Sequence, residues 1–217
     1  MLGLARKQIS GIEKGTFFMK LNGVRFLSKS VVAATVVALP SALYAVDHTV
    51  DCTGAGDFTT IQAAVNAAAS GDRIFIVPCS LGLGVYDEEI TVTDKDLDIR
   101  GDGTGEVKLQ NTNNLNPVFL LIDNNPAGTH FTSLRDVTIT GKTQAQDLFN
   151  SSGMDFHLGR CNLKNTTDTA VYGLANNMTV NNCKFVNLEW RAILLEGVDS
   201  GGGAAPVMFM NGNYVKK

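Results

Sequence analysis

The apolar residues between positions 60 and 70 recur at the spacing of an α-helix. They form one narrow stripe of Ile61, Ala64, Val65, Ala68 and Ala69. Thr59 and Gln62, three positions apart, resemble a capping box, and Ser70-Gly71 ends the pattern. We therefore expect a short amphipathic helix that lies against another part of the fold.

After residue 72 the helical period disappears and short segments with apolar ends replace it. These segments are Ile74–Ile76, Leu97–Ile99, Val137–Ile139, Cys161–Leu163 and Cys183–Phe185. All but the first have a polar middle residue, which is the two-residue period of a half-buried strand. Their last residues are 23, 40, 24 and 22 positions apart, and Tyr214 follows 29 positions after the fifth segment. Spacings of 22–24 indicate an internal repeat.

Other positions keep the same register. One column consists of Leu134, Leu158, Val180 and Phe209, a second of Thr132, Phe156, Met178 and Val207, and a third of Phe149, Val171 and Ile193. Asn recurs at turn positions, including Asn165 and Asn187. The 40-residue interval contains the apolar run Val118–Ile122, and the sequence leaves open whether that interval is a full coil plus an insertion.

A repeat of about 23 residues cannot bury its apolar side alone, so each coil must stack on the next as a parallel neighbour. Apolar columns then form the core, and Asn and Gly form the turns. The pattern predicts an all-β protein, a parallel β-helix of about five or six coils. The helix near residue 60 would cap its first end and hide an unpaired strand edge.

Charge narrows the class of partner. The chain has 217 residues with a net charge of −3, and residues 46–217 hold 12 Lys+Arg against 20 Asp+Glu, a net of −8. This excess of acid argues against nucleic acid. It also argues that a polysaccharide or glycan partner is neutral, or is bridged by a cation.

The amino end predicts export. Residues 19–29 are basic, and Ser30–Ala45 is apolar, uncharged and followed by an acceptable cleavage site. We read 19–45 as a signal peptide, 1–18 as an over-called start and 46–217 as the mature β-helix domain. The protein would then be secreted, periplasmic or at the cell surface, with membrane attachment only through an uncleaved signal.

The four cysteines fall in the exported part, and none forms a CxxC pair. Cys52 and Cys79 flank the helix and are the candidates for a disulfide that ties the cap to the first coil. Cys161 and Cys183 fall in an inward column, where we expect stacked, buried thiols.

Three segments carry a resemblance to a known family. GDFTTIQAAVNAAASGDRIFIVP, GVYDEEITV and DLDIRGDG, within 56–103, look like the opening of the pectin-lyase-like superfamily, and of pectinesterases in particular. Residues 131–195 resemble it more loosely. The resemblance implies a right-handed parallel β-helix, a scaffold that hosts lyases, hydrolases, esterases and proteins without activity.

The pectinesterase pattern assigns roles residue by residue. In QAQDL, Gln144 would help to stabilise the oxyanion, and in TDTA, Asp168 would be the general acid. One coil later, where the nucleophilic Asp is expected, Trp190 stands with Glu189 beside it, and the Arg of the family motif has no counterpart. The catalytic set is incomplete. The sequence therefore favours a carbohydrate-associated binding or structural role, with a pectinesterase-like esterase or polysaccharide lyase as the alternative.

A second group of candidates comes from the repeat. Asp136 and Arg160 occupy equivalent turns of successive coils, while His157 and Lys184 lie on outward strand faces. Together they would form a polar patch for sugar hydroxyls, or an ordinary surface ladder with one ion pair.

Two further features have alternative interpretations. Asp94, Asp96, Asp98 and Asp102 alternate along one strand face and are either a Ca²⁺ site or, in our preferred interpretation, a solvated acidic face without metal. Residues 213–217 still have strand character with no cap after them. That predicts a truncated reading frame or self-association at the C-terminal edge.

Overall fold

The alternating segments become strands because each can hydrogen-bond to the equivalent segments of the coils before and after it. A computed structural model describes residues 44–112, 116–124, 130–141, 147–175, 177–197 and 207–216, all within one unit, Leu43–Lys217. The predicted over-called start and nearly all of the predicted signal peptide lie outside the described residues. Among the described residues, no helix is long and apolar enough to span a membrane.

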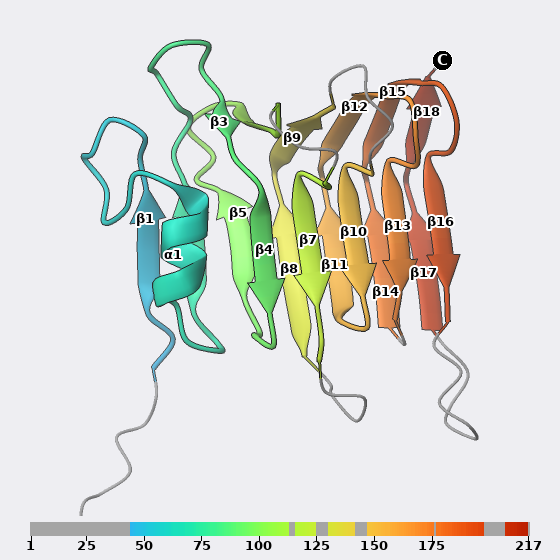
Figure 1. Ribbon diagram of the computed structural model, residues 1–217, viewed down its shortest axis with the longest axis horizontal. Helices are drawn as coiled ribbons and strands as arrows, with labels where there is room; N and C mark the ends of the chain where they lie inside the picture. The colour runs from blue at the N-terminus through green and yellow to red at the C-terminus, as the bar shows by residue number, and fades with distance from the viewer. Residues whose placement is uncertain are drawn as a thin grey trace, which may run out of the picture. The chain divides into compact units, whose positions relative to one another are not determined.

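The strands form three parallel sheets, which we call sheets I, II and III (Figure 1). Sheet I contains β1 (Asp47–Val50), β2 (Arg73–Ile76), β5 (Asp98–Gly101), β8 (Phe131–Arg135), β11 (Asp155–Gly159), β14 (Asn177–Asn181) and β17 (Val207–Asn211). Sheet II contains β3 (Tyr86–Asp87), β6 (Val107–Gln110), β9 (Val137–Thr140), β12 (Asn162–Thr166), β15 (Lys184–Leu188) and β18 (Tyr214–Lys216). Sheet III contains β4 (Ile90–Thr93), β7 (Phe119–Ile122), β10 (Phe149–Ser152), β13 (Val171–Leu174) and β16 (Ile193–Glu196).

One strand from each sheet makes one coil, so the described chain is a right-handed parallel β-helix with five complete coils from β2 to β16. β1 precedes these coils, and β17 and β18 begin a sixth. The predicted fold class and number of coils are confirmed.

The predicted core columns are confirmed in the middle coils. Leu134 pairs with Leu158, and Leu158 with Val180, and all three are buried. The third column, Phe149, Val171 and Ile193, is paired in register as well. Apolar side chains stacked at every coil give one continuous core, because each coil buries the apolar face of its neighbour.

The predicted spacings are wrong where the connecting loops change length. Ile76 pairs with Gly101, 25 residues on, instead of Ile99. Val180 pairs with Met210 instead of Phe209, because the last repeat is 30 residues long. The predicted pairing of Met178 with Val207 is wrong by the same single residue, since Met208 is its partner.

The predicted spacing of 40 residues related two strands that belong to different sheets. Ile99 pairs with Leu134, 35 residues on, in sheet I. The later part of the series, Ile139 and Leu163, belongs to sheet II. The apolar run Val118–Ile122 supplies β7, so the interval contains a full coil.

Residues in the left-handed region make the corners of the coils. Asp136, Arg160 and Asn182 have φ of 60°, 52° and 53° and separate sheet I from sheet II in three successive coils. Asn165 and Asn187 also have positive φ, and the Asn187 Nδ2 donates to Asn165 Oδ1 at 2.9 Å. The predicted Asn turn column is therefore a hydrogen-bonded ladder.

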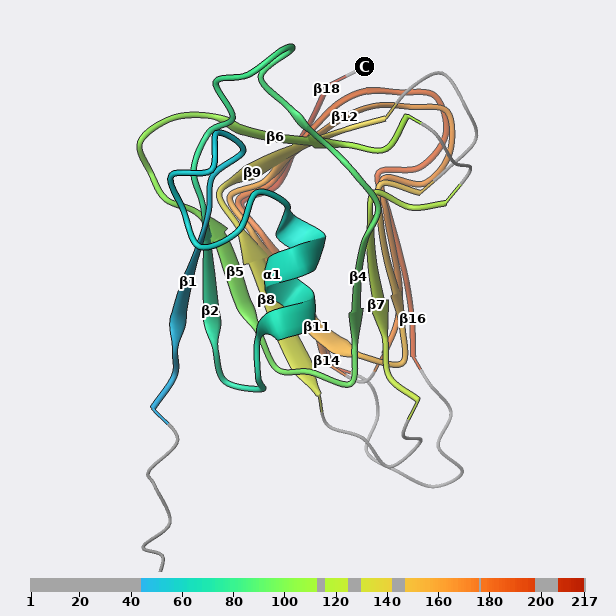
Figure 2. The same ribbon diagram turned by 60° about the vertical axis from the view of Figure 1, so that its left-hand side comes forward.

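Helix α1 (Ile61–Ala67) lies over the open start of the coils, next to β1, β2 and β4 (Figure 2). Its N-cap is Thr60 instead of the predicted Thr59, and Thr60 Oγ1 accepts from Ala63 N at 3.3 Å. Gln62 does not close a capping box. Its amide instead bonds both backbone groups of Thr91, at 2.6 and 3.1 Å, and so satisfies the edge strand β4.

Side chains of the first coil hold both ends of α1. The Glu88 carboxylate accepts from the amides of Ile61 and Gln62, each at 2.9 Å, at the positive end of the helix. Burial raises the pKa of Glu88, and these amide bonds act in the opposite direction. Lys95 Nζ donates to the carbonyls of Val65 and Ala68 at 2.8 Å, where the last turn needs donors.

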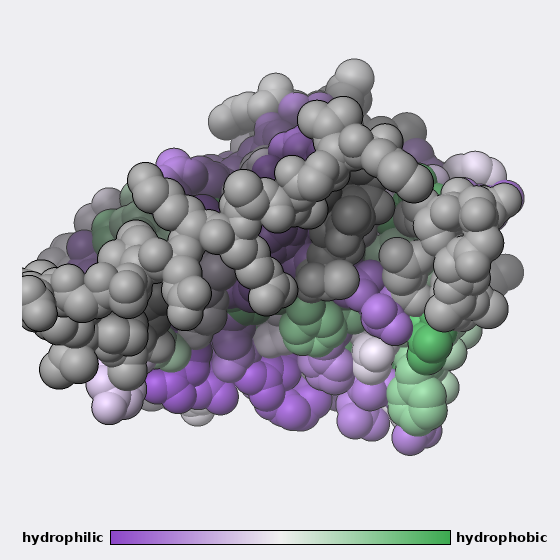
Figure 3. Space-filling model, turned by 90° about the horizontal axis from the view of Figure 1, so that it is seen from below, coloured by the Kyte–Doolittle hydropathy of each residue, from purple (hydrophilic) through white to green (hydrophobic). Residues whose placement is uncertain are grey.

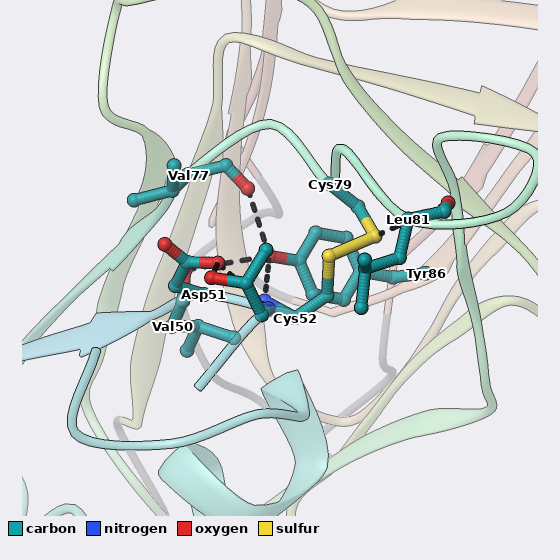
Figure 4. Close-up of a disulfide and its surroundings, with 8 residues drawn as sticks. Val50, Asp51, Cys52, Val77, Cys79, Leu81 and Tyr86 are labelled. Atoms are coloured by element: carbon teal, nitrogen blue, oxygen red, sulfur yellow. Dashed lines mark hydrogen bonds between the residues drawn. A yellow bond between two sulfur atoms is a disulfide. The ribbon is translucent and has the colours of Figure 1, made fainter. Parts of the chain in front are cut away.

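A disulfide joins Cys52 to Cys79 beside the helix (Figure 4). The Tyr86 hydroxyl accepts from Cys52 N at 3.2 Å and donates to the Val77 carbonyl at 2.8 Å, so one side chain links both half-cystine segments. Cys161 and Cys183 are free and buried, as predicted.

The last described coil is apolar and exposed. The inward-facing Met208 and Met210 of β17 are 41% and 57% exposed, although their partners Met178 and Val180 are fully buried. Figure 3 shows hydrophobic (green) residues at its right-hand end, where β17 lies in Figure 1. The two ends of the described β-helix therefore differ: the first is covered by α1, and nothing described covers the last.

Candidate functional site

The predicted pair Asp136 and Arg160 forms a bidentate ion pair at the corner between sheets I and II. Arg160 Nε and Nη2 donate to the two Asp136 carboxylate oxygens at 2.6 and 2.5 Å, and this pairing raises the pKa of Arg160. Both residues line a pocket of about 330 Å³ together with Glu106, Thr138 and Asn162.

The other two residues of the predicted patch lie on different surfaces. Lys184 pairs with Asn162 on sheet II and is exposed, one coil beyond the pocket. His157 lies on the outward face of sheet I, where burial and the charges of Arg135 and Arg160 lower its pKa. Of the four predicted residues, Asp136 and Arg160 are bonded directly to each other, and the charge of Arg160 also acts on His157.

A second polar surface lies on the outward face of sheet III. In this sheet Phe149 and Val171 point into the core, so the next residues of the same strands, Asn150 and Tyr172, point outward. Asp147, just before β10, accepts a hydrogen bond from Asn150 Nδ2 at 2.9 Å. Tyr172 pairs with Asn150 in the next coil.

Asp147 and Asp168 interact across one coil. Asp168 precedes β13, its amide donates to Thr166 Oγ1 at 3.1 Å, and its carboxylate accepts from Thr169 N at 2.8 Å. Burial raises the pKa of Asp147, and the negative charge of Asp168 raises it further. The charge of Asp168 thus adds to burial in favouring the protonated form of Asp147.

Two aromatic side chains lie in or just before the strands that follow Asp168. Trp190 is 62% exposed, and the Arg191 guanidinium lies 4.3 Å from its ring centroid. Tyr172 OH donates to Glu196 at 3.2 Å, and burial raises the pKa of Tyr172, with the charge of Glu196 adding to it. An exposed ring, a phenol and carboxylates thus lie along three successive coils.

The resemblance-based candidates have mixed outcomes. Glu189 is exposed, and its amide donates to the Thr166 carbonyl at 3.0 Å. Gln144 lies outside the described residues. Asp147 was missed, although its 21-residue distance from Asp168 is within one residue of the coil length and both precede a strand.

No protein-family model, curated protein or solved structure matches the chain.

The four alternating carboxylates have separate partners. Arg135 Nη2 donates to both carboxylate oxygens of Asp98 at 2.6 Å. The Asp96 carboxylate accepts from Phe131 N, and the Asp102 carboxylate accepts from the Thr104 hydroxyl. Within the described ranges, only Asp94 of these four belongs to a group with metal-binding geometry.

Proposed function

We propose that the protein is an exported β-helix that binds a carbohydrate chain along the outward face of sheet III. The observation that supports this is that successive coils place Asp147 just before β10, Tyr172 in β13 and Trp190 just before β16. Adjacent strands lie about 4.8 Å apart, so each coil presents one set of side chains to the next unit along a chain.

The residue types suit sugars. A pyranose ring has an apolar C–H face and a rim of hydroxyls, and an exposed indole such as Trp190 can cover the former. Carboxylates can accept hydrogen bonds from the sugar hydroxyls, and the Tyr172 hydroxyl can donate or accept one. The net charge of −8 over residues 46–217 favours neutral glycans over free polyanions. The resemblance to the pectin-lyase-like superfamily points to methyl-esterified pectin as the first ligand to try.

Binding can be tested by calorimetry with methyl-esterified and demethylated pectin, each with and without Ca²⁺. We expect saturable binding of the esterified form. Replacing Trp190 by Ala should weaken it about tenfold, a loss of about 1.4 kcal/mol. Phe131→Ala, which removes an exposed aromatic residue from sheet I, is the matched control and should bind normally. Absence of binding to every form, or equal losses in both variants, would contradict the proposal.

Export is part of the proposal and rests on residues 19–45. Amino-terminal sequencing of the protein recovered outside the cytoplasm should give Val46 as the first residue. A mature protein that still begins at Met1 or Met19 would contradict cleavage of a signal.

The raised pKa of Asp147 beside Asp168 favours a second candidate, hydrolysis of a glycan or its ester. A protonated Asp147 would act as general acid, and Asp168 as nucleophile or base. This assigns the acid role to Asp147 in place of Asp168. It also supplies a carboxylate pair one coil before the position that the pectinesterase pattern indicates.

Esterase and β-elimination assays on the same pectins distinguish binding from catalysis. If the second candidate holds, Asp168→Asn and Asp147→Asn each lower hydrolysis at least 100-fold. Activity should also fall as pH rises through the pKa of Asp147, because the acid form is then lost. Asp136→Asn, in the separate corner pocket, is the control. No hydrolysis by the wild type, or hydrolysis unchanged in Asp168→Asn, would eliminate this candidate.

A further inference from the structure

Three metal-ligating side chains meet at the end of sheet III opposite the Asp147 turn. Asp94 follows β4, Asp123 follows β7, and His130 precedes β8. One ligand atom from each lies within 4.8 Å of the other two, and His130 Nδ1 is 3.3 Å from Asp123 Oδ2. Residues from two coils and the start of a third therefore converge on one point.

The backbone fixes the two carboxylates in equivalent positions. Asp94 N donates to the Ile122 carbonyl and Asp123 N to the Ser152 carbonyl, each at 3.0 Å, so the same residue follows the same strand in successive coils. Stacking of coils then places one carboxylate over the other. Asn124 holds the Asp94 carboxylate through its amide at 2.7 Å and its side chain at 3.1 Å.

The three candidate ligands differ in exposure. The Asp123 side chain is 2% exposed and the His130 side chain 27% exposed, whereas Asp94 lies at the surface. A divalent cation bound by both carboxylates and by the imidazole would be reached from solvent on the Asp94 side and held from within by Asp123.

We propose that Asp94, Asp123 and His130 bind a divalent transition-metal ion, with Zn²⁺ as the probe. The proposal is independent of carbohydrate binding. An imidazole with two carboxylates suits Zn²⁺ and related ions, whereas Ca²⁺ and Mg²⁺ take oxygen ligands only. Three protein ligands leave at least one position of a tetrahedral ion for water.

The test is isothermal titration of the purified mature protein with ZnCl₂, and separately with CaCl₂, at pH 7.5. We expect one Zn²⁺ per chain and at least tenfold weaker Ca²⁺ binding. His130→Gln and Asp94→Asn should each weaken Zn²⁺ binding at least tenfold. Asp94 is exposed, so its variant should fold even if changes at the buried Asp123 do not.

His48→Gln is the matched control. His48 Nε2 lies 3.2 Å from Asp72 Oδ2, so it forms a similar His–Asp pair, but it belongs to no metal-ligating group of three among the described residues. The control should bind Zn²⁺ as the wild type does. Absence of saturable Zn²⁺ binding, stronger Ca²⁺ than Zn²⁺ binding, or equal losses in His48→Gln and His130→Gln would overturn the assignment.

Discussion

Removing the Cys52–Cys79 disulfide should destabilise the capped end of the β-helix. The bond closes a loop with a sequence separation of 27 residues. By the chain-entropy relation, opening such a loop in the unfolded state costs about 3.5 kcal/mol of stability. The Tyr86 hydroxyl bonds remain possible in the variant, so the loss should not exceed this value greatly.

The perturbation is the double variant Cys52→Ala/Cys79→Ala, and the assay is urea unfolding followed by far-UV circular dichroism. The midpoint should fall in proportion to a loss of about 3.5 kcal/mol. Wild-type protein measured in dithiothreitol should match the variant, and the variant should not respond to the reductant. A loss below about 1 kcal/mol would refute the view that this bond constrains the unfolded chain, as would a reductant effect in the variant.

Three other expectations follow from the fold. In Gly141→Ala the added Cβ would overlap the Asn165 carbonyl oxygen. The free energy of unfolding measured in urea should therefore fall by about 2 kcal/mol. An unchanged midpoint would contradict the tight corner. Burial acts to raise the pKa of Asp72, but amide bonds and His48 outweigh it and lower the pKa. The stabilisation by Asp72 should therefore be present above pH 3.8 and be lost as pH falls through the lower folded value, and Asp72→Asn should flatten that part of the stability–pH curve. The exposed edge of β17 should drive self-association that Met210→Lys abolishes, and sedimentation velocity showing a wild-type monomer at all concentrations would contradict it.

The middle coils could be predicted from the sequence because every coil must place apolar side chains in the same inward columns. Leu134, Leu158 and Val180 share a column because the corner after each strand is a single left-handed residue or a short turn. The prediction failed at Gly101 and Met210, where longer connections change the coil length: between sheets I and II before Gly101, and between sheets III and I before Met210. Side-chain period carries no information about the length of such loops.

The candidate sites were less predictable. Asp136 and Arg160 are 24 residues apart, and this spacing predicted their contact because both occupy the same corner of successive coils. Asp147 lies in a turn, outside the strand period, and its spacing from Asp168 is one residue short of the column repeat. His130 could not be anticipated, since Met154 stands at the equivalent position of the next coil and breaks the column.

The unequal ends give the molecule a direction of local opening. The disulfide, the Glu88 and Lys95 contacts and α1 all secure the first coil, whereas β16, β17 and β18 have a described neighbour on one side only. Amide hydrogen exchange should therefore be slowest near β2 and become faster coil by coil toward β17. Trp190 and Tyr172 lie in this faster-exchanging half, so a long ligand bridging several coils would slow amide exchange there most. An ion held between Asp94 and Asp123 would instead slow exchange near the protected start.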